Sequence, residues 1–148
     1  MAERANGYSV YSVSGEAYVQ EIEHILVPAG PVPVGPFSHA VRFGRLMFVT
    51  GQMPTSPEGE PTIVDGGIEV QTRRVMDNLR LILSSQNVDF GGVLMARVFL
   101  LDFQRDYALM NSVYESYFES TRRPARTCVG VTGLALNALV EIDLVVAC

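Results

Sequence analysis

Two short strands are predicted between residues 38 and 49 by the alternation of apolar and polar residues. Val41 and Phe43 alternate with polar neighbours, and the Gly44-Arg45 pair that follows is typical of a tight turn. The next four residues, 46–49, are all apolar. This arrangement predicts a hairpin whose second strand is buried.

Three further strands are predicted in the second half of the chain. Residues 93–101 are apolar except for Arg97, which predicts a strand covered on both faces. Residues 125–131 and 139–147 are expected to form the others. In the last strand the residues expected to share one face are Val140, Ile142, Leu144 and Val146.

Two helices are predicted by apolar residues spaced three and four positions apart. The first spans about residues 67–86, with Asn87 as its expected end. The second spans about residues 105–120, and Asp102 or Asp106 is expected to cap its N-terminus. The apolar stripe of the second helix consists of Tyr107, Met110, Val113, Tyr114, Tyr117 and Phe118.

The order of these elements predicts an α+β fold in which a mixed sheet carries two helices on one face. Such a domain leaves the other face of the sheet open, and a second copy of the chain is the simplest cover. We expect the domain to span residues 22–148. Residues 1–21 show no clear period and are expected to form an N-terminal arm, either loosely packed or covering a neighbouring subunit.

Composition narrows the function classes. The chain has 148 residues, 48% of them hydrophobic and 18% charged, which predicts one folded domain and excludes wholesale disorder. The net charge of −5 argues against a general nucleic-acid binder. No apolar run is long enough to cross a bilayer, and the N-terminus lacks the apolar region of a secretory signal. We therefore expect a cytoplasmic protein with no membrane partner.

Neither a metal nor a cofactor is expected. The two cysteines, Cys128 and Cys148, lack metal-type spacing, and the two histidines, His24 and His39, are isolated from each other. The sequence also lacks a phosphate-binding P-loop, a GxGxxG turn, a GxSxG elbow and an HExxH helix.

Arg126 and Glu141 are the two strongest candidates for chemistry. Arg126 follows Pro124 at the start of a predicted strand, where the backbone would hold its guanidinium in position for a carboxylate or phosphate. The alternative is a solvated surface arginine. Glu141 interrupts an apolar strand and points the same way as Asp143. Either this is the solvent face of an edge strand, or it lines a subunit interface near Arg126, where the carboxylate can activate water.

Three other residues are weaker candidates. Phe37 lies in a turn shaped by Gly35 and Pro36, where it would form an apolar wall or simply part of the core. Gly51 follows an apolar strand and either exposes backbone N–H to a ligand or permits a tight turn. Asn111 is placed among the core residues of the second helix and either caps a pocket or faces solvent.

Several short motifs, taken in order, resemble the RidA (YjgF) family of reactive-intermediate deaminases. They run from about residue 22 to the end of the chain and are individually weak. The matching segments are residues 33–40 (PVGPFSHA), 49–52 (VTGQ), 78–79 (NL), 111–114 (NSVY), 124–126 (PAR) and 140–143 (VEID).

This resemblance implies a chorismate-mutase-like homotrimer with active sites between subunits. It also implies hydrolysis of enamines and imines, such as 2-aminoacrylate and its imine tautomer, to 2-keto acids and ammonia without a cofactor. In that scheme Arg126 binds the substrate carboxylate and Glu141 positions water or relays a proton. The residues implied to bind substrate or to shape the pocket are Phe37, Gly51, Asn111, Thr127 and Cys128.

Two departures from the family pattern affect the expected substrate. Phe37 stands where the best-known deaminases carry Tyr, and residues 134–137 (LALN) replace a more usual Leu-Pro-Lys type of turn. These changes indicate a divergent member. A binding or sensing protein for keto acids on the same scaffold is the main alternative function, and RNA cleavage is a third that the acidic charge disfavours.

Overall fold

The computed structural model describes the backbone of residues 9–13 and 16–148. Its strands are β1 (Ser9–Val13), β2 (Glu16–Gln20), β3 (Ile22–Ile25), β4 (Ala40–Phe43), β5 (Leu46–Gln52), β6 (Val93–Leu100), β7 (Ala125–Gly130) and β8 (Val140–Ala147). Its helices are α1 (Ile68–Ser85) and α2 (Phe103–Tyr114), with short 3-10 turns at Phe90–Gly92, Glu115–Tyr117 and Ala135–Asn137.

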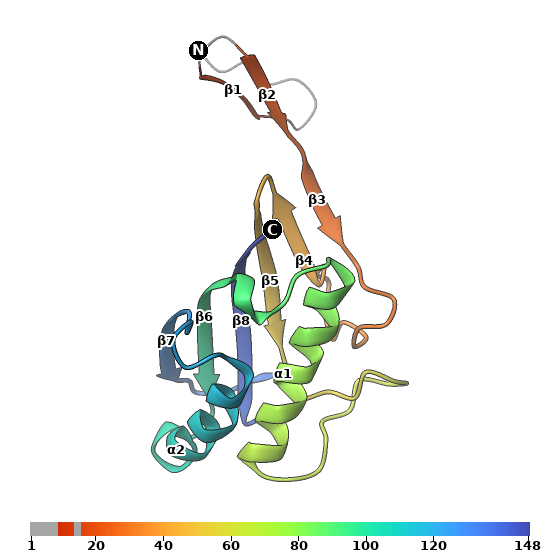
Figure 1. The fold of residues 1–148 in the computed structure, drawn as a ribbon. Helices are drawn as coiled ribbons and strands as arrows, with labels where there is room; N and C mark the ends of the chain where they lie inside the picture. Colours follow the sequence, from red (N-terminus) through yellow and green to blue (C-terminus); the bar gives the residue numbers. More distant parts are fainter. Residues whose placement is uncertain (1–8, 14–15) are drawn as a thin grey trace.

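Six strands form one mixed sheet in the order β3-β4-β5-β8-β6-β7. Every neighbouring pair is antiparallel except β6 and β7, which are parallel. Both helices lie on the same face of this sheet (Figure 1). The predicted α+β layer pair is therefore confirmed.

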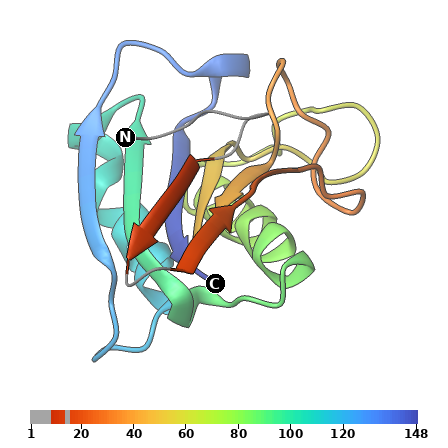
Figure 2. The same ribbon diagram turned by 90° about the horizontal axis from the view of Figure 1, so that it is seen from above.

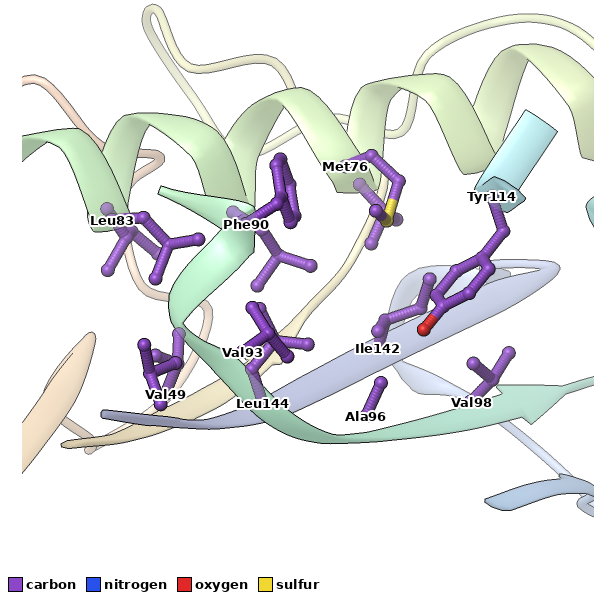
Figure 3. Close-up of a cluster of buried hydrophobic side chains, with 14 of the residues drawn as sticks. Val49, Met76, Leu83, Phe90, Val93, Ala96, Val98, Tyr114, Ile142 and Leu144 are labelled. Carbon is purple, nitrogen blue, oxygen red and sulfur yellow. The ribbon is translucent and has the colours of Figure 1, made fainter. Parts of the chain in front are cut away.

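The core lies between this face and the helices, and β8 shows how the sequence builds it. Val140, Ile142, Leu144 and Val146 are all buried, as the alternation predicts. They meet buried residues of α1 such as Met76 and Leu83 (Figure 3). Burying each such side chain contributes about 1.5–3 kcal/mol, so the helix layer fixes which face of β8 points inward.

The helix ends agree with the prediction for α1 but not for α2. Asn87, just after α1, adopts a left-handed conformation with φ of 57°, which Asn tolerates well. Asp102 caps α2 by accepting a hydrogen bond from the Arg105 amide at 3.1 Å. However, α2 ends at Tyr114 rather than near residue 120. The apolar stripe continues because the following 3-10 turn keeps Tyr117 and Phe118 packed on Phe90.

The residues that the structure describes leave the second face of the sheet open in the single chain. Phe48 and Val129 are exposed there, and Arg97 forms an exposed ion pair with Asp143 at 2.8 Å. The expectation that residues 93–101 are covered on both faces is therefore wrong for one copy, because the helices cover only the face that carries Ala96 and Val98.

The N-terminal region contains strands that the sequence pattern did not reveal. β1 and β2 pair antiparallel as a separate two-stranded sheet, which projects beyond the large sheet in Figure 1. β3 pairs with β4 at the edge of the large sheet. Residues 1–8 and 14–15 lie outside the described residues, so the arm over residues 1–21 and the domain boundary at residue 22 stay predictions.

Two long connections, residues 26–39 and 53–67, lie on the same side of the molecule (Figures 1 and 2). They bring the turn-rich loop that carries Phe37 close to the end of β5, where both line one small cavity. Among the residues described, no helix has the length and apolar character needed to cross a membrane.

Candidate active site

Arg126 lies on β7 in register with Ala96 of β6, which directs its side chain to the helix-covered face. Its Nη1 donates a hydrogen bond to Asn111 Oδ1 of α2 at 2.7 Å. The guanidinium carbon lies 4.8 Å from the centroid of the Tyr114 ring. In the part of the chain that the structure describes, no carboxylate pairs with Arg126. The guanidinium is therefore held by neutral partners and its remaining N–H donors are available to an anion.

The aromatic ring of Tyr114 packs against the guanidinium group of Arg126. The residue is 5% exposed, and burial raises the pKa of its hydroxyl to about 12, an effect that the nearby Arg126 charge opposes. The hydroxyl is directed toward the strands of the sheet (Figure 3) and has no hydrogen-bond partner among the described residues. Tyr114 thus acts through its ring, as a cation–π platform.

Cys128 shares the face of Arg126, because it lies two residues further along β7. Its side chain is half-buried, and this burial raises the pKa of the thiol, with the Arg126 charge opposing the shift. The thiol is therefore protonated at neutral pH and is a poor nucleophile. Thr127 lies between them, is in register with Arg97, and faces the open side of the sheet.

Glu141 lies on the open face of the sheet. It is in register with Phe99 of β6, on the opposite side from the buried Ile142. Its carboxylate fills the space left by Gly51, where an added Cβ would come within 2.9 Å of the Glu141 Cδ. Burial, and secondarily the charge of Asp143, raise the pKa of Glu141. A half-buried carboxylate with a raised pKa is suited to accepting and returning a proton.

Gly51 reaches Glu141 because β5 contains a bulge. The pairing of β5 with β8 shifts register between Val49 and Gln52, so that one extra residue is accommodated on β5. Phe37, which is 39% exposed, and Gly51 line the same small cavity. The other residues that line it are Pro31, Val32, Pro33, Val34, His39, Gln52, Met53 and Thr55.

The predicted residues therefore form two groups. One contains Arg126, Asn111 and Cys128 on the helix side, and the other contains Glu141, Gly51 and Phe37 on the open side or its margin. Within one chain Arg126 and Glu141 point to opposite faces of the sheet. The expectation that these two side chains lie near each other is therefore not met in a single copy, because the alternation of side chains along the strands directs them to opposite faces. Their proximity across two subunits stays a prediction.

Sequence reasoning missed two contributors to these groups. The apolar stripe of the second helix predicts Tyr114 as a core residue, and only its position three residues after Asn111 indicates that it contacts the same arginine. His39 was noted as isolated in the sequence, whereas its ring is buried beside the cavity. Over the described residues, no three His, Cys, Asp or Glu side chains gather as metal ligands.

Comparison with known proteins identifies the chain. Residues 27–148 match the sequence model of the family described as endoribonuclease L-PSP, which is the RidA (YjgF) family. The chain belongs to the RidA family. A RutC family protein of Pyrococcus abyssi is 40% identical over 124 residues, which cover 83% of this chain and 94% of that protein. The family resemblance predicted from the short motifs is therefore confirmed.

Solved structures agree with this family assignment. YyfA from Yersinia pestis, a protein of unknown function from the Rid family, has a TM-score of 0.81 against this chain. The two chains are 29% identical, and the match covers 86% of this chain and 100% of that one. Escherichia coli TdcF, crystallised with bound serine, has a TM-score of 0.76 and 26% identity, covering 85% of this chain and 98% of that one. The chorismate-mutase-like α+β fold expected from the resemblance is confirmed.

Proposed function

We propose that this RidA family member hydrolyses small enamine and imine intermediates of the 2-aminoacrylate type to 2-keto acids and ammonia. The observation that carries the proposal is the pair of complementary half-sites. One presents an arginine with free N–H donors, and the other presents a half-buried glutamate whose pKa is raised. A small imino acid has one group for each half-site, an anionic carboxylate and a reactive C=N bond.

Arg126 binds the substrate carboxylate in this proposal. The hydrogen bond to Asn111 and the ring of Tyr114 restrict the guanidinium plane, so less side-chain freedom is lost on binding. Cys128 lies beside it on the edge strand, where the backbone N–H and C=O groups of β7 that do not face β6 are available to the substrate nitrogen or to water.

Glu141 activates the water. The substrate reacts as its protonated imine. The Glu141 carboxylate accepts a proton from water as the water oxygen forms a bond to the imine carbon and the C=N electron pair moves to nitrogen, which gives a neutral carbinolamine. The carboxyl returns this proton to the amino nitrogen, the C–N bond breaks with its electron pair leaving on ammonia, and the carbinolamine hydroxyl passes its proton to the Glu141 carboxylate as the C=O bond of the keto acid forms. The raised pKa of Glu141 makes its carboxylate a stronger base and so favours acceptance of the proton from water. The proposed reaction is a hydrolysis and requires no oxidant or reductant.

The complete site requires two copies of the chain, which we propose assemble as a homotrimer. Arg126 and Glu141 point to opposite faces of the sheet, so the open face of one copy must meet the β7 edge of the next to bring them together. The open face carries apolar side chains, including Phe48 and Val129, that a neighbouring copy would cover. A trimer closes such a head-to-tail contact and forms three equivalent sites.

The first experiment is replacement of the arginine. We expect Arg126→Ala to lose ammonia release from enzymatically generated 2-aminoacrylate while the trimer persists in solution. Arg123→Ala removes an exposed arginine of the preceding turn and is the matched control, for which we expect wild-type activity. Retained activity in Arg126→Ala would contradict the proposal.

A complementation experiment tests the shared site directly. We expect Arg126→Ala and Glu141→Gln chains to be inactive alone, whereas a mixed trimer would contain one interface at which both native residues meet. Random mixing in equal amounts gives active sites at about a quarter of all interfaces, so about a quarter of wild-type activity is expected. Unchanged inactivity of refolded mixtures that contain mixed trimers would show that the two residues do not act together across a subunit interface.

Binding of a keto acid or amino acid without turnover is the second candidate function. The bound serine of the TdcF crystal structure favours it, because serine offers the same carboxylate to an arginine. A binding protein needs Arg126 but not Glu141, so affinity for pyruvate that survives Glu141→Gln, in a wild type that releases no ammonia, would favour this candidate. RNA cleavage, which the family description suggests, is disfavoured by the net charge of −5.

A further inference from the structure

Both ring nitrogens of His39 are engaged by the main chain of the segment that precedes it. His39 directly precedes β4 and is 3% exposed. The Val27 N–H donates to Nδ1 at 2.9 Å, and Nε2 lies 2.7 Å from the Pro31 carbonyl oxygen. Because Nδ1 accepts a hydrogen bond, the proton resides on Nε2, which donates to Pro31. The neutral imidazole therefore bridges two backbone groups four residues apart.

The segment held by His39 begins the loop that carries Phe37. Gly30 donates to the Val27 carbonyl at 3.0 Å and closes a turn around the ring. A Cβ on Gly30 would lie 3.3 Å from His39 Cε1, so the turn packs closely against the imidazole. The four prolines between residues 28 and 36 lack N–H donors. The loop therefore depends on side-chain anchors rather than on a backbone ladder.

A second anchor ties the other end of the loop to the bulge of β5. Thr50 Oγ1 donates to the Ser38 carbonyl at 2.7 Å, and the Thr50 N–H donates to the His39 carbonyl at 3.0 Å. Thr50 directly precedes Gly51, which abuts the Glu141 carboxylate. The cavity lined by Phe37 and Gly51 thus lies between a loop fixed at both ends and the strand that supports the glutamate.

We infer that His39 is a positioning residue for the RidA site: its neutral imidazole holds residues 27–37 against the β5 bulge and so sets the cavity wall beside Glu141. The ring itself takes no part in the chemistry, since both of its nitrogens are occupied by backbone groups. This inference rests on the proposed deaminase function. A role in stability alone would be shared by any well-packed replacement, whereas a positioning role requires one acceptor and one donor in the same side chain.

His39→Gln and His39→Leu separate the two roles. Glutamine offers an acceptor for Val27 and a donor for Pro31, whereas leucine fills the volume without either. We expect His39→Leu to raise the KM for the imine by roughly tenfold, with a much smaller change in kcat, because a misplaced wall weakens substrate alignment. His39→Gln is expected to restore most of the wild-type KM. His24→Leu, at the other histidine, is exposed on β3 and is the matched control.

Two further measurements keep the test decisive if the leucine variant folds poorly. Thr50→Val removes the hydrogen bond to Ser38 with little change in shape and is expected to raise KM by about threefold, since one of two anchors remains. Hydrogen exchange at the Val27 amide is expected to be fast in His39→Leu and slow in His39→Gln. A wild-type KM in both Thr50→Val and a folded His39→Leu would overturn the positioning role, as would failure of His39→Gln to restore KM.

Failure of the proposed function has a different signature. A wild-type protein and a His24→Leu control that both release no ammonia would overturn the deaminase proposal and the positioning role together. An active wild type whose KM is unaffected by the loss of either anchor would overturn the positioning role alone.

Discussion

The carboxylate of Glu141 occupies the volume that any side chain at position 51 would fill. Gly51 is therefore required by close approach rather than by an unusual backbone angle. The bulge that brings Gly51 to this point lies between Val49 and Gln52 of β5, next to the central strand that carries the glutamate. The register of β5 against β8 and the absence of a Cβ at Gly51 together determine the position of the Glu141 carboxylate.

Gly51→Ala is expected to displace Glu141 and to lower deaminase activity by at least about tenfold, because small misplacements of a reacting group have large effects on rate. The cost in stability is expected to be about 1–3 kcal/mol, as for other overpacked sites. Ammonia release and urea unfolding measure the two effects. Gly133→Ala, where a Cβ meets nothing within 4 Å, is the control and is expected to change neither.

Replacing the glutamate by its neutral amide is expected to stabilise the protein while removing activity. The pKa of Glu141 is raised in the folded state by burial and by Asp143. The folded protein therefore holds this proton more tightly than the unfolded chain does, and stability falls as the pH rises from the unfolded pKa of about 4.3 through the raised folded value. At neutral pH the ionised carboxylate is the destabilised form.

We accordingly expect Glu141→Gln to melt above wild type at pH 7.5 and to lose this advantage near pH 4, where the carboxyl of the folded wild type is protonated. Thermal unfolding across that pH range measures the effect. Glu58→Gln, on an exposed loop, is the matched control. An equal difference in melting temperature at both pH values would contradict the pKa direction.

Asn111→Asp is expected to compete with the substrate carboxylate for the guanidinium group of Arg126. The new carboxylate would stand where Asn111 Oδ1 accepts from Arg126 at 2.7 Å and would form an ion pair with the guanidinium. Hydrogen bonds to charged groups contribute about 1.5–3 kcal/mol, so KM is expected to rise roughly ten- to hundredfold. Ser112→Asp adds the same charge at the next, exposed position of α2 and is expected to leave KM unchanged.

Tyr114→Phe is expected to be neutral or stabilising. The hydroxyl is buried without a partner among the described residues, whereas the ring provides the contact to Arg126. Removing an unsatisfied buried hydroxyl recovers its desolvation cost of about 1–3 kcal/mol. Chemical denaturation and steady-state kinetics test this, with KM expected to stay within twofold of wild type by the same reasoning. A large loss of stability would show that the hydroxyl has a partner.

Much of the layer structure was predictable because it depends on local periodicity. The inward positions of β8 and the stripe of α1 follow from spacing, and the helix cover buries them as expected. The end of α2 was not predictable in this way, because Tyr117 and Phe118 keep the helical spacing through a 3-10 turn. β3 was missed because only Ile25 of its four residues is buried, which leaves no alternation to detect.

The residues of the candidate site were predictable individually, but their relation to one another was not. Arg126 and Glu141 stand out as a proline-set arginine and as a carboxylate in an apolar strand. Whether they share a face depends on the register of β7 against β6 and of β6 against β8, which no local pattern encodes. The contribution of His39 was likewise hidden, because its partners are backbone atoms of Val27 and Pro31.

The positions of β8 and β7 in the sheet imply that the strands carrying Glu141 and Arg126 differ in how easily they open locally. β8 is flanked on both sides by β5 and β6, so the backbone that carries Glu141 can move only when most of the domain unfolds. Among the described strands β7 pairs only with β6, so the backbone that carries Arg126 can shift by local fraying of one parallel edge. If the proposed site forms, substrates of different length would be accommodated by movement of the strand that carries Arg126, while the strand that carries Glu141 stays fixed.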